Sequence, residues 1–261
     1  MSTRLAGKTV LVTRPRSQAD ELRALLEAHG ARVVIQPVIE ILPPKDPAEL
    51  DAALDAVAAK EFDWAVFSSE NGVRFTLNRL AEKTSDPALF FEKGGVKLAA
   101  VGSHTADVLS QYGLAVAVAP KRFDADGLVD ALAERCGAQS LAGASFLSFR
   151  ASRGRKTLSE RLTGYGARVR EVVAYESVDV DAADPDVLDE MRRGKIDFAT
   201  VSSSASAKSL ARLFGTALEK TRTVAISPLT AGALETQGAR VAAIAQEATM
   251  QGLVNAVLSL V

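Results

Sequence analysis

Short runs of apolar, mostly β-branched residues alternate along this chain with segments whose apolar residues recur every three or four positions. The short runs are almost continuously apolar, which is typical of strands covered on both faces of a parallel sheet. They predict strands at 9–13, 32–36, 64–68, 97–101, 114–118, 145–149, 168–172, 197–201, 223–227 and 240–244. The segments between them have helical spacing, as Val73, Leu77 and Leu80 illustrate. Alternating strands and helices predict an α/β fold with parallel sheets and right-handed crossovers.

Glycines mark where several of these helices end. Gly30, Gly113, Gly166 and Gly238 each follow a predicted helix and precede a predicted strand. A glycine just beyond a helix accepts the left-handed conformation that ends the helix. These four positions therefore support the element boundaries.

The chain also repeats itself. Residues 5–40 align without a gap with 141–176. Further matches join 62–80 to 196–214, 98–119 to 223–245, and 126–132 to 251–257. A repeat of about a hundred residues is much longer than a solenoid repeat and close to the size of a domain. We therefore expect two similar, doubly wound, five-stranded parallel-sheet domains, and a pair of domains usually implies a cleft.

The ten strands can be divided between the two domains in two ways. A simple tandem divides the chain near residue 137. In the crossed arrangement one domain is discontinuous, and two extended linkers join it to the other. Its bounds are 1–36 with 179–261 for the first domain, 45–170 for the second, and 37–44 and 171–178 for the linkers. Periodicity leaves both open and slightly favours the crossed arrangement, because both linkers are longer than most connections.

Composition narrows the class of protein. Of 261 residues, 48% are hydrophobic and 24% charged, and the net charge of −1 gives no reason to expect nucleic acid as a partner. A lone Cys136 fits a reducing compartment, and we expect a cytoplasmic monomer without export signal or membrane span. Two histidines far apart do not favour a zinc site. The phosphate-binding motifs GxGxxG and GxxxxGK[ST] are missing, so we expect neither NAD, FAD nor ATP.

Hydroxyl-rich turns follow four of the predicted strands. They carry Ser68, Ser69 and Asn71 in the first turn, Ser103 and Thr105 in the second, Ser203 and Ser206 in the third, and Pro228 and Thr230 in the fourth. In open parallel sheets, ligands bind beyond the carboxyl ends of the strands. Each turn opens a helix and so offers backbone N–H groups, a hydroxyl and the positive end of the helix dipole. Any one of these residues could simply cap its helix, but four such ends favour a polyanionic ligand.

Other candidates come from matches and differences between the copies. Arg14 recurs as Arg150 at the end of a first strand, where an arginine suits a carboxylate, and Arg153 and Arg155 lie just beyond Arg150. Tyr175 faces Ile39, so one copy has gained a phenol that can donate a proton or a hydrogen bond. His104 faces Leu229, and we expect it to be simply exposed. An arginine that ties down a helix end, or a tyrosine that only packs, remains the alternative.

At this point the residues resemble a known family. The run VLVTRPRSQADELRALLEAHGARVVIQPVIEI, the SSENGV turn, the VREVVAYE stretch and the SPLTAGALETQGARV segment together resemble uroporphyrinogen-III synthases over essentially the whole chain. The resemblance implies the crossed arrangement of two α/β domains. It also implies a cofactor-free lyase that cyclises hydroxymethylbilane, a linear tetrapyrrole with acetate and propionate groups, to uroporphyrinogen III. Water leaves the terminal hydroxymethyl group, and the terminal pyrrole ring is inverted before closure.

The resemblance also assigns roles to residues. Tyr175 matches the family's linker tyrosine, an acid or orienting group, and Thr230 matches the threonine of its GPxTA turn, so we expect these two as the catalytic residues. Ser69 and Ser203 match the serines of two TS turns, and Arg14 and Arg150 its strand-end arginines. Two positions depart from the pattern: Ser227 stands where glycine is usual, and Lys208 where an apolar residue is usual.

Two other functions stay open at this point. A non-catalytic, hinged binding or regulatory module could keep the fold, but the presence of Tyr175 and Thr230 argues against it. A periplasmic type of anion-binding protein would need an export signal.

Overall fold

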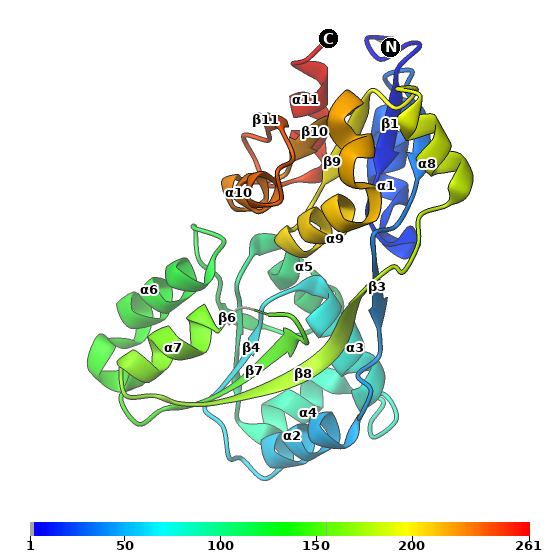
Figure 1. Cartoon of the computed structure of the whole chain (residues 1–261). Coiled ribbons are helices and arrows are strands. Elements are labelled where there is room, and N and C mark those ends of the chain that lie inside the picture. Colours follow the sequence, from blue (N-terminus) through cyan, green and yellow to red (C-terminus); the bar gives the residue numbers. More distant parts are fainter. Residues whose placement is uncertain (1–2, 155) are drawn as a thin grey trace. The chain divides into compact units, whose positions relative to one another are not determined.

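The computed structural model describes residues 3–154 and 156–261. The chain forms two compact units: the residues up to 40 together with 178–261, and residues 41–177 (Figure 1). The first unit is therefore discontinuous in sequence. The linker bounds 37–44 and 171–178 stay a prediction, although the chain there is extended: Ile39–Leu42 is strand β3, and Arg168–Asp179 is strand β8.

The first unit is built on a parallel sheet with the order β11-β10-β9-β1-β2. Its strands are β1 (Thr9–Val12), β2 (Arg32–Ile35), β9 (Phe198–Val201), β10 (Arg222–Ala225) and β11 (Val241–Ile244). Its helices are η1 (Arg16–Gln18), α1 (Asp20–Glu27), α8 (Pro185–Arg192), α9 (Ser204–Phe214), η3 (Gly215–Lys220), α10 (Pro228–Thr236) and α11 (Met250–Leu258). The five strands predicted for this sheet all form.

The second unit has the strand order β3-β8-β7-β4-β5-β6. Besides β3 and β8, its strands are β4 (Trp64–Phe67), β5 (Lys97–Ala100), β6 (Val116–Val118) and β7 (Ser145–Ala151). Its helices are α2 (Ala48–Ala58), α3 (Glu70–Leu80), α4 (Pro87–Gly94), α5 (Ser103–Gln111), α6 (Ala125–Cys136), η2 (Ala138–Leu141) and α7 (Thr157–Gly164). Over the described residues this sheet has six strands instead of the expected five, because β3 adds to its edge beside β8.

The sheet of the second unit separates two apolar cores. Along β4, Trp64 and Val66 pack into one core, while Ala65 and Phe67 pack into the other. Trp64 stacks on Phe146 at 6.1 Å between ring centroids. On the opposite face Phe67 lies 4.7 Å from Phe149. Both faces of the strand are thus covered, which explains its unbroken apolar run.

The predicted glycine turns form. Gly30 has φ of 85° and Gly166 has φ of 83°, a region that other residues rarely adopt. In each, the glycine N–H and the next N–H bond back to carbonyls in the last turn of the helix. These motifs end α1 and α7 and turn the chain into β2 and β8.

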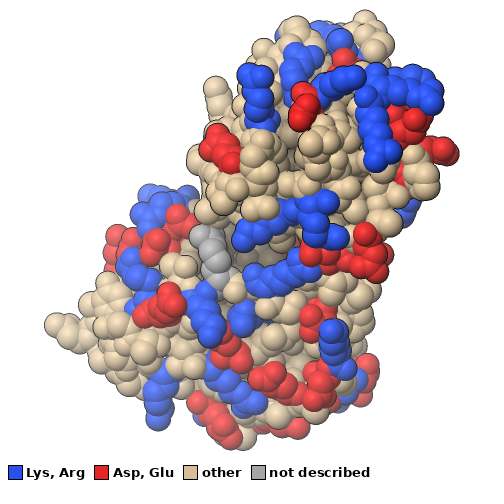
Figure 2. All heavy atoms as spheres, in the orientation of Figure 1, with Lys and Arg blue, Asp and Glu red and all other residues tan. Residues whose placement is uncertain are grey.

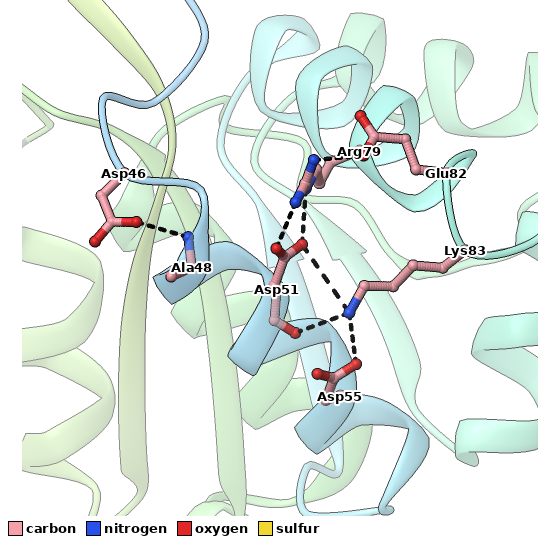
Figure 3. A network of polar contacts seen from close by, with 7 residues as sticks. All are labelled: Asp46, Ala48, Asp51, Asp55, Arg79, Glu82 and Lys83. Carbon is pink, nitrogen blue, oxygen red and sulfur yellow. Dashed lines mark hydrogen bonds and ion pairs between the residues drawn. The ribbon is translucent and has the colours of Figure 1, made fainter.

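Ion pairs fasten α2 to the far end of α3 (Figure 3). Arg79 Nε donates to Asp51 Oδ1 at 2.7 Å, and Lys83 Nζ donates to Asp55 Oδ1 at 2.6 Å. Arg79 also pairs with Glu82. The hydrogen bonds from Arg79 hold the pKa of Asp51 below its usual value. This network lies at the C-terminal end of α3, away from the carboxyl edge of the sheet, where α3 begins.

The amino edges of the two sheets carry equivalent contacts. In the second unit, the backbone N–H of Ser145 donates to Asp63 Oδ2 at 2.7 Å, and Lys97 lies over the Trp64 ring at 5.5 Å.

In the first unit, the backbone N–H of Thr9 donates to Asp197 Oδ2 at 2.9 Å. Arg222 lies over the Phe198 ring at 4.2 Å. Each aspartate thus joins the start of its own strand to the start of the neighbouring strand.

Candidate functional site

The four hydroxyl-rich turns lie where the sequence predicts them, at the carboxyl ends of strands. In the second unit α3 follows β4 and α5 follows β5, while in the first α9 follows β9 and α10 follows β10. Within each unit the two strands are neighbours in the sheet, so their helix N-termini share one edge. Each edge therefore concentrates backbone N–H groups and positive dipole ends.

In the second unit, Tyr175 lies against the first turn of α3. Its hydroxyl is 3.0 Å from Ser69 Oγ and also hydrogen-bonds with the Asn71 side chain. Phe75, one turn further along α3, stacks on the Tyr175 ring at 5.9 Å between centroids. Ser69 is the N-cap of α3, with its Oγ accepting the N–H of Gly72 at 3.1 Å. The structure thus brings Ser69, Asn71 and Tyr175 together.

The environment of Tyr175 fixes its protonation. Only 7% of its surface is exposed, and this burial raises the pKa of the phenol above its usual value of 10.0. The hydrogen bonds from Ser69 and Asn71 act in the opposite direction without cancelling the rise. The phenol is therefore protonated at neutral pH.

Ser68 and the first turn of α5 lie on the same edge. Ser68 is exposed and donates to the carbonyl of Phe149 at 3.3 Å. Ser103 is exposed and Thr105 is buried in the first turn of α5, whose N-cap is Gly102 and makes no side-chain cap bond. A Cβ built at Gly102 would be 3.9 Å from the Cβ of Phe123, so this helix end is roomy.

In the first unit, α9 begins with a closed serine pair. Ser203 is the N-cap and accepts the N–H of Ser206 at 3.0 Å, and the two hydroxyls are 2.8 Å apart. Ser206 is buried. Of this pair, Ser203 is the member that reaches the surface.

The start of α10 is closed in the same way. Its N-cap is Ser227, whose Oγ accepts the N–H of Thr230 at 3.3 Å and lies 3.2 Å from the Thr230 hydroxyl. Thr230 is thus buried and hydrogen-bonded to the N-cap residue. That residue, Ser227, stands where the family usually has glycine. Pro228 is the first residue of α10 and is exposed. Lys208 is exposed on α9.

The two strand-end arginines hold their own loops. Arg14 Nε donates to the carbonyl of Gln18 at 2.8 Å. Arg150 Nη1 donates to the carbonyls of Ala151 and Gly154, both at 3.1 Å, and its Nε lies 3.1 Å from Glu171 Oε2. These contacts support the structural alternative, and a substrate contact from either arginine stays a prediction. Arg153 is exposed, whereas Arg155 lies outside the described residues.

Two residues at the carboxyl edge of the second unit's sheet (the second edge), Phe75 and Glu70, were not singled out by the sequence as site residues. Phe75 orients the Tyr175 ring, and Glu70 pairs with the exposed His104 at 2.8 Å. His104 is exposed, as expected, but it is not solitary. The i, i+4 spacing of Glu70 and Arg74 was the available signal for an ion pair, whereas the His104 contact depends on the packing of α3 beside α5.

Charges of both signs are mixed on one face of the molecule. On the face drawn in Figure 2, Lys and Arg side chains are interspersed with Asp and Glu. Within residues 3–154 and 156–261, no helix is long and apolar enough to cross a membrane. The same residues contain no group of three or more His, Cys, Asp or Glu able to hold a metal ion.

Fold and site together define a class. This is a duplicated α/β protein whose parallel sheets present paired helix N-termini and hydroxyls, donors suited to an anionic small molecule. The family model for uroporphyrinogen-III synthase HemD matches residues 20–255. The chain belongs to the uroporphyrinogen-III synthase family, the cyclising lyases of tetrapyrrole biosynthesis.

Individual relatives agree with this assignment. The uroporphyrinogen-III synthase of Synechococcus elongatus is 31% identical over 262 residues, which cover 97% of this chain and 95% of that protein. That of Chlorobaculum parvum is 30% identical over 237 residues, 90% of this chain and 91% of the relative.

Solved structures show the same fold. A mutant uroporphyrinogen III synthase from Thermus thermophilus has a TM-score of 0.65 at 17% identity, over 95% of this chain and 96% of that one. The uroporphyrinogen-III synthetase of Helicobacter pylori has a TM-score of 0.64 at 18% identity, over 97% and 100%.

Proposed function

We propose that this chain converts hydroxymethylbilane to uroporphyrinogen III, with Tyr175 assisting the loss of water from the terminal hydroxymethyl group. The observation that carries the proposal is the Tyr175 hydroxyl, held 3.0 Å from the N-cap Ser69 at the carboxyl edge of the second sheet. Family membership supplies the substrate class, a linear tetrapyrrole carrying carboxylates.

The hydrogen-bond inventory supports a donor role for Tyr175. Ser69 Oγ already accepts the Gly72 N–H, and its own proton can be donated to the Tyr175 oxygen. In that arrangement the phenolic O–H is available to a departing hydroxyl group. The phenol is protonated at neutral pH and assists the departure by donating a hydrogen bond as negative charge develops on the leaving oxygen. The proton released from the pyrrole N–H as the C–O bond breaks joins the departing hydroxide, so that water is lost overall.

The helix N-termini supply the other requirement, which is to hold carboxylates. The first turns of α3, α5, α9 and α10 offer N–H groups and the positive ends of helix dipoles, worth about 0.3–1 kcal/mol each for the dipole. Ser68, Ser103, Thr105 and Ser203 add hydroxyls at these ends. With a net charge of −1, the protein attracts its substrate through such local groups.

Geometry matters here as much as rate. Closure without the enzyme gives the other isomer, uroporphyrinogen I, so the protein must hold the chain while the terminal ring inverts. Several fixed carboxylate contacts restrict the conformations from which closure occurs. A monomeric state and a cytoplasmic location stay predictions from the sequence.

A coupled assay tests the proposal. Hydroxymethylbilane is generated in situ, and the products are oxidised and separated into isomers I and III. We expect predominantly isomer III in the presence of this protein. Isomer I at the rate seen without protein would contradict the proposal and favour the non-catalytic binding module.

A further inference from the structure

A charged contact joins the first turns of α3 and α5. Glu70, the first residue of α3, has a carboxylate that accepts from Arg74 Nε at 2.6 Å and lies 2.8 Å from His104 Nε2. Its side chain is 23% exposed, whereas that of His104 is 73% exposed. Glu70 is thus a half-buried carboxylate held from two helices.

The pairing keeps this carboxylate ionised. Burial acts to raise the pKa of Glu70, but the hydrogen bonds from His104 and Arg74 outweigh it and hold the pKa below its usual value. Arg74 compensates the charge of Glu70 on its own helix, and its pKa is raised, chiefly by the hydrogen bond to Glu70. The site proposed for a polyanion therefore contains an ionised carboxylate that is paired with the cationic Arg74 and lies beside His104.

The first unit has a contact between the equivalent positions. The repeat aligns Glu70 with Ser204 and His104 with Leu229. Ser204 Oγ donates to the carbonyl of Leu229 at 3.5 Å. Both units thus join their paired helices through the same two positions, but the join is neutral in the first unit and charged in the second.

The charged contact lies beside Tyr175, the proposed hydrogen-bond donor. Ser69, which touches the Tyr175 hydroxyl, immediately precedes Glu70, and Asn71 immediately follows it. Any movement of the first turn of α3 therefore moves the two groups that hold the phenol. Through His104, the same turn is tied to the first turn of α5.

We infer that Glu70 is a positioning residue, which acts through His104 to hold the first turn of α5 in a fixed place relative to the Tyr175 hydroxyl. The inference rests on the proposed function. A substrate carboxylate at α5 and the leaving hydroxyl at Tyr175 are parts of one molecule, so the distance between their two binding groups sets the pose in which water is lost.

Variants of the pair separate positioning from stability. His104→Leu installs the residue found in the first unit, and Glu70→Ala removes the carboxylate. His104→Gln and Glu70→Gln keep a donor and an acceptor, respectively, and serve as rescue variants. Arg79→Leu is the matched control, because it breaks the ion pair between α3 and α2 at the other end of the same helix.

Each variant is assayed for kcat, KM and the fraction of isomer III, with the melting temperature measured in parallel. His104→Leu and Glu70→Ala should lower kcat about threefold to tenfold and lower the isomer III fraction, since a small displacement is costly to catalysis. The two Gln variants should remain within about twofold of wild type, because they can still form the bond. Arg79→Leu should lower the melting temperature and leave kcat per folded molecule and the isomer fraction unchanged.

The outcomes are distinguishable from those of the proposed function. If wild type forms isomer III and Tyr175→Phe impairs it, but His104→Leu and Glu70→Ala match wild type in kcat and isomer fraction, the positioning role is overturned. It is overturned equally if Arg79→Leu changes the isomer fraction as much as His104→Leu does. If wild type forms no isomer III, it is the proposed function that fails.

Discussion

The two units of this chain are alike at the amino edges of their sheets and different at the carboxyl edges. At the amino edges Asp63 and Asp197 accept a backbone N–H from the neighbouring strand, and Lys97 and Arg222 each lie over an aromatic ring. These contacts are nearly the same in the two units. They join strand to strand, and the requirements of a parallel sheet are the same in both units.

At the carboxyl edges the equivalent positions have diverged. Gly102 of the second unit corresponds to Ser227 of the first, so α5 begins without a side-chain cap while α10 is capped from within. The second edge carries the buried phenol of Tyr175 and the Glu70–His104 pair, and the first carries hydroxyl pairs. This difference leads us to predict that the second edge, with its buried phenol, performs the chemistry.

The largest effect is expected from Tyr175. Tyr175→Phe removes one oxygen and should lower turnover about tenfold to a thousandfold, the range for a lost acid–base group. Its stability cost should be about 0.5–1.5 kcal/mol, because Ser69 and Asn71 lose a partner. Steady-state kinetics and urea unfolding measure the two effects. Tyr112→Phe, at a half-exposed tyrosine on the end of α5, is the matched control, and an equal loss there would remove the special role of Tyr175.

The buried threonines of the two edges form a matched pair. Thr105 and Thr230 are each the third residue of their helix. If both edges hold carboxylates, Thr105→Ala and Thr230→Ala should each raise KM about threefold to tenfold. Product binding, followed by thermal shift, should weaken in parallel. A loss of stability with unchanged KM in either variant would assign that threonine to packing alone.

The amino edges should respond through stability only. Asp63→Asn and Asp197→Asn should each destabilise by about 1 kcal/mol, because a charge-assisted bond to a backbone N–H is weakened at a position that solvent still reaches. Denaturant unfolding measures this, and the isomer III fraction should not change. A change in the isomer ratio from either variant would contradict the view that the amino edges only stabilise the fold.

Asp63 also gives a pH dependence. Its pKa is lowered, first by the backbone N–H of Ser145 and then by the Ser145 hydroxyl. A carboxyl whose pKa is lower in the folded state stabilises the fold above its unfolded pKa of about 3.9, and this contribution is lost as the pH falls through the folded value. When the pH is lowered below about 4, the free energy of unfolding of Asp63→Asn should therefore fall less steeply than that of wild type. Denaturant unfolding at a series of pH values measures this.

The smallest effect tests the cap difference directly. The structure has room for Gly102→Ser. The backbone at Gly102 is extended, and an added Cβ would lie at van der Waals distance, 3.9 Å, from the Cβ of Phe123. The new hydroxyl should cap α5 and stabilise by a few tenths of a kcal/mol. It should also compete with a substrate carboxylate for the same N–H and raise KM. Ser227→Gly should do the reverse at α10, and KM changes of the same sign in both variants would contradict this account.

Much of the fold could be predicted from the sequence. All ten predicted strands form, because each is an apolar run bounded by turn residues. The strand β3 was not predicted as a sheet member, since the segment around Glu40 and Pro43 is too short and too mixed in polarity to be recognised, whereas in the structure it lies beside the long strand β8.

The site was predicted less completely. Ser69 and Ser203 cap their helices, as such turns usually do. The sequence could not show that Arg14 and Arg150 bond to nearby carbonyls, because that depends on the course of their loops. It could not show the contact between Glu70 and His104 either. They are 34 residues apart, and their contact follows from the packing of α3 beside α5.

The central claim is that the carboxyl edge of the second sheet performs the chemistry, whereas the amino edge only stabilises the fold. It is tested most directly by the isomers formed from hydroxymethylbilane by wild type, Tyr175→Phe and Asp63→Asn at equal folded concentration. The account predicts mainly isomer III from wild type and from Asp63→Asn, and a greatly slowed reaction with an increased share of isomer I from Tyr175→Phe. Equal rates and equal isomer III fractions from wild type and Tyr175→Phe would contradict it.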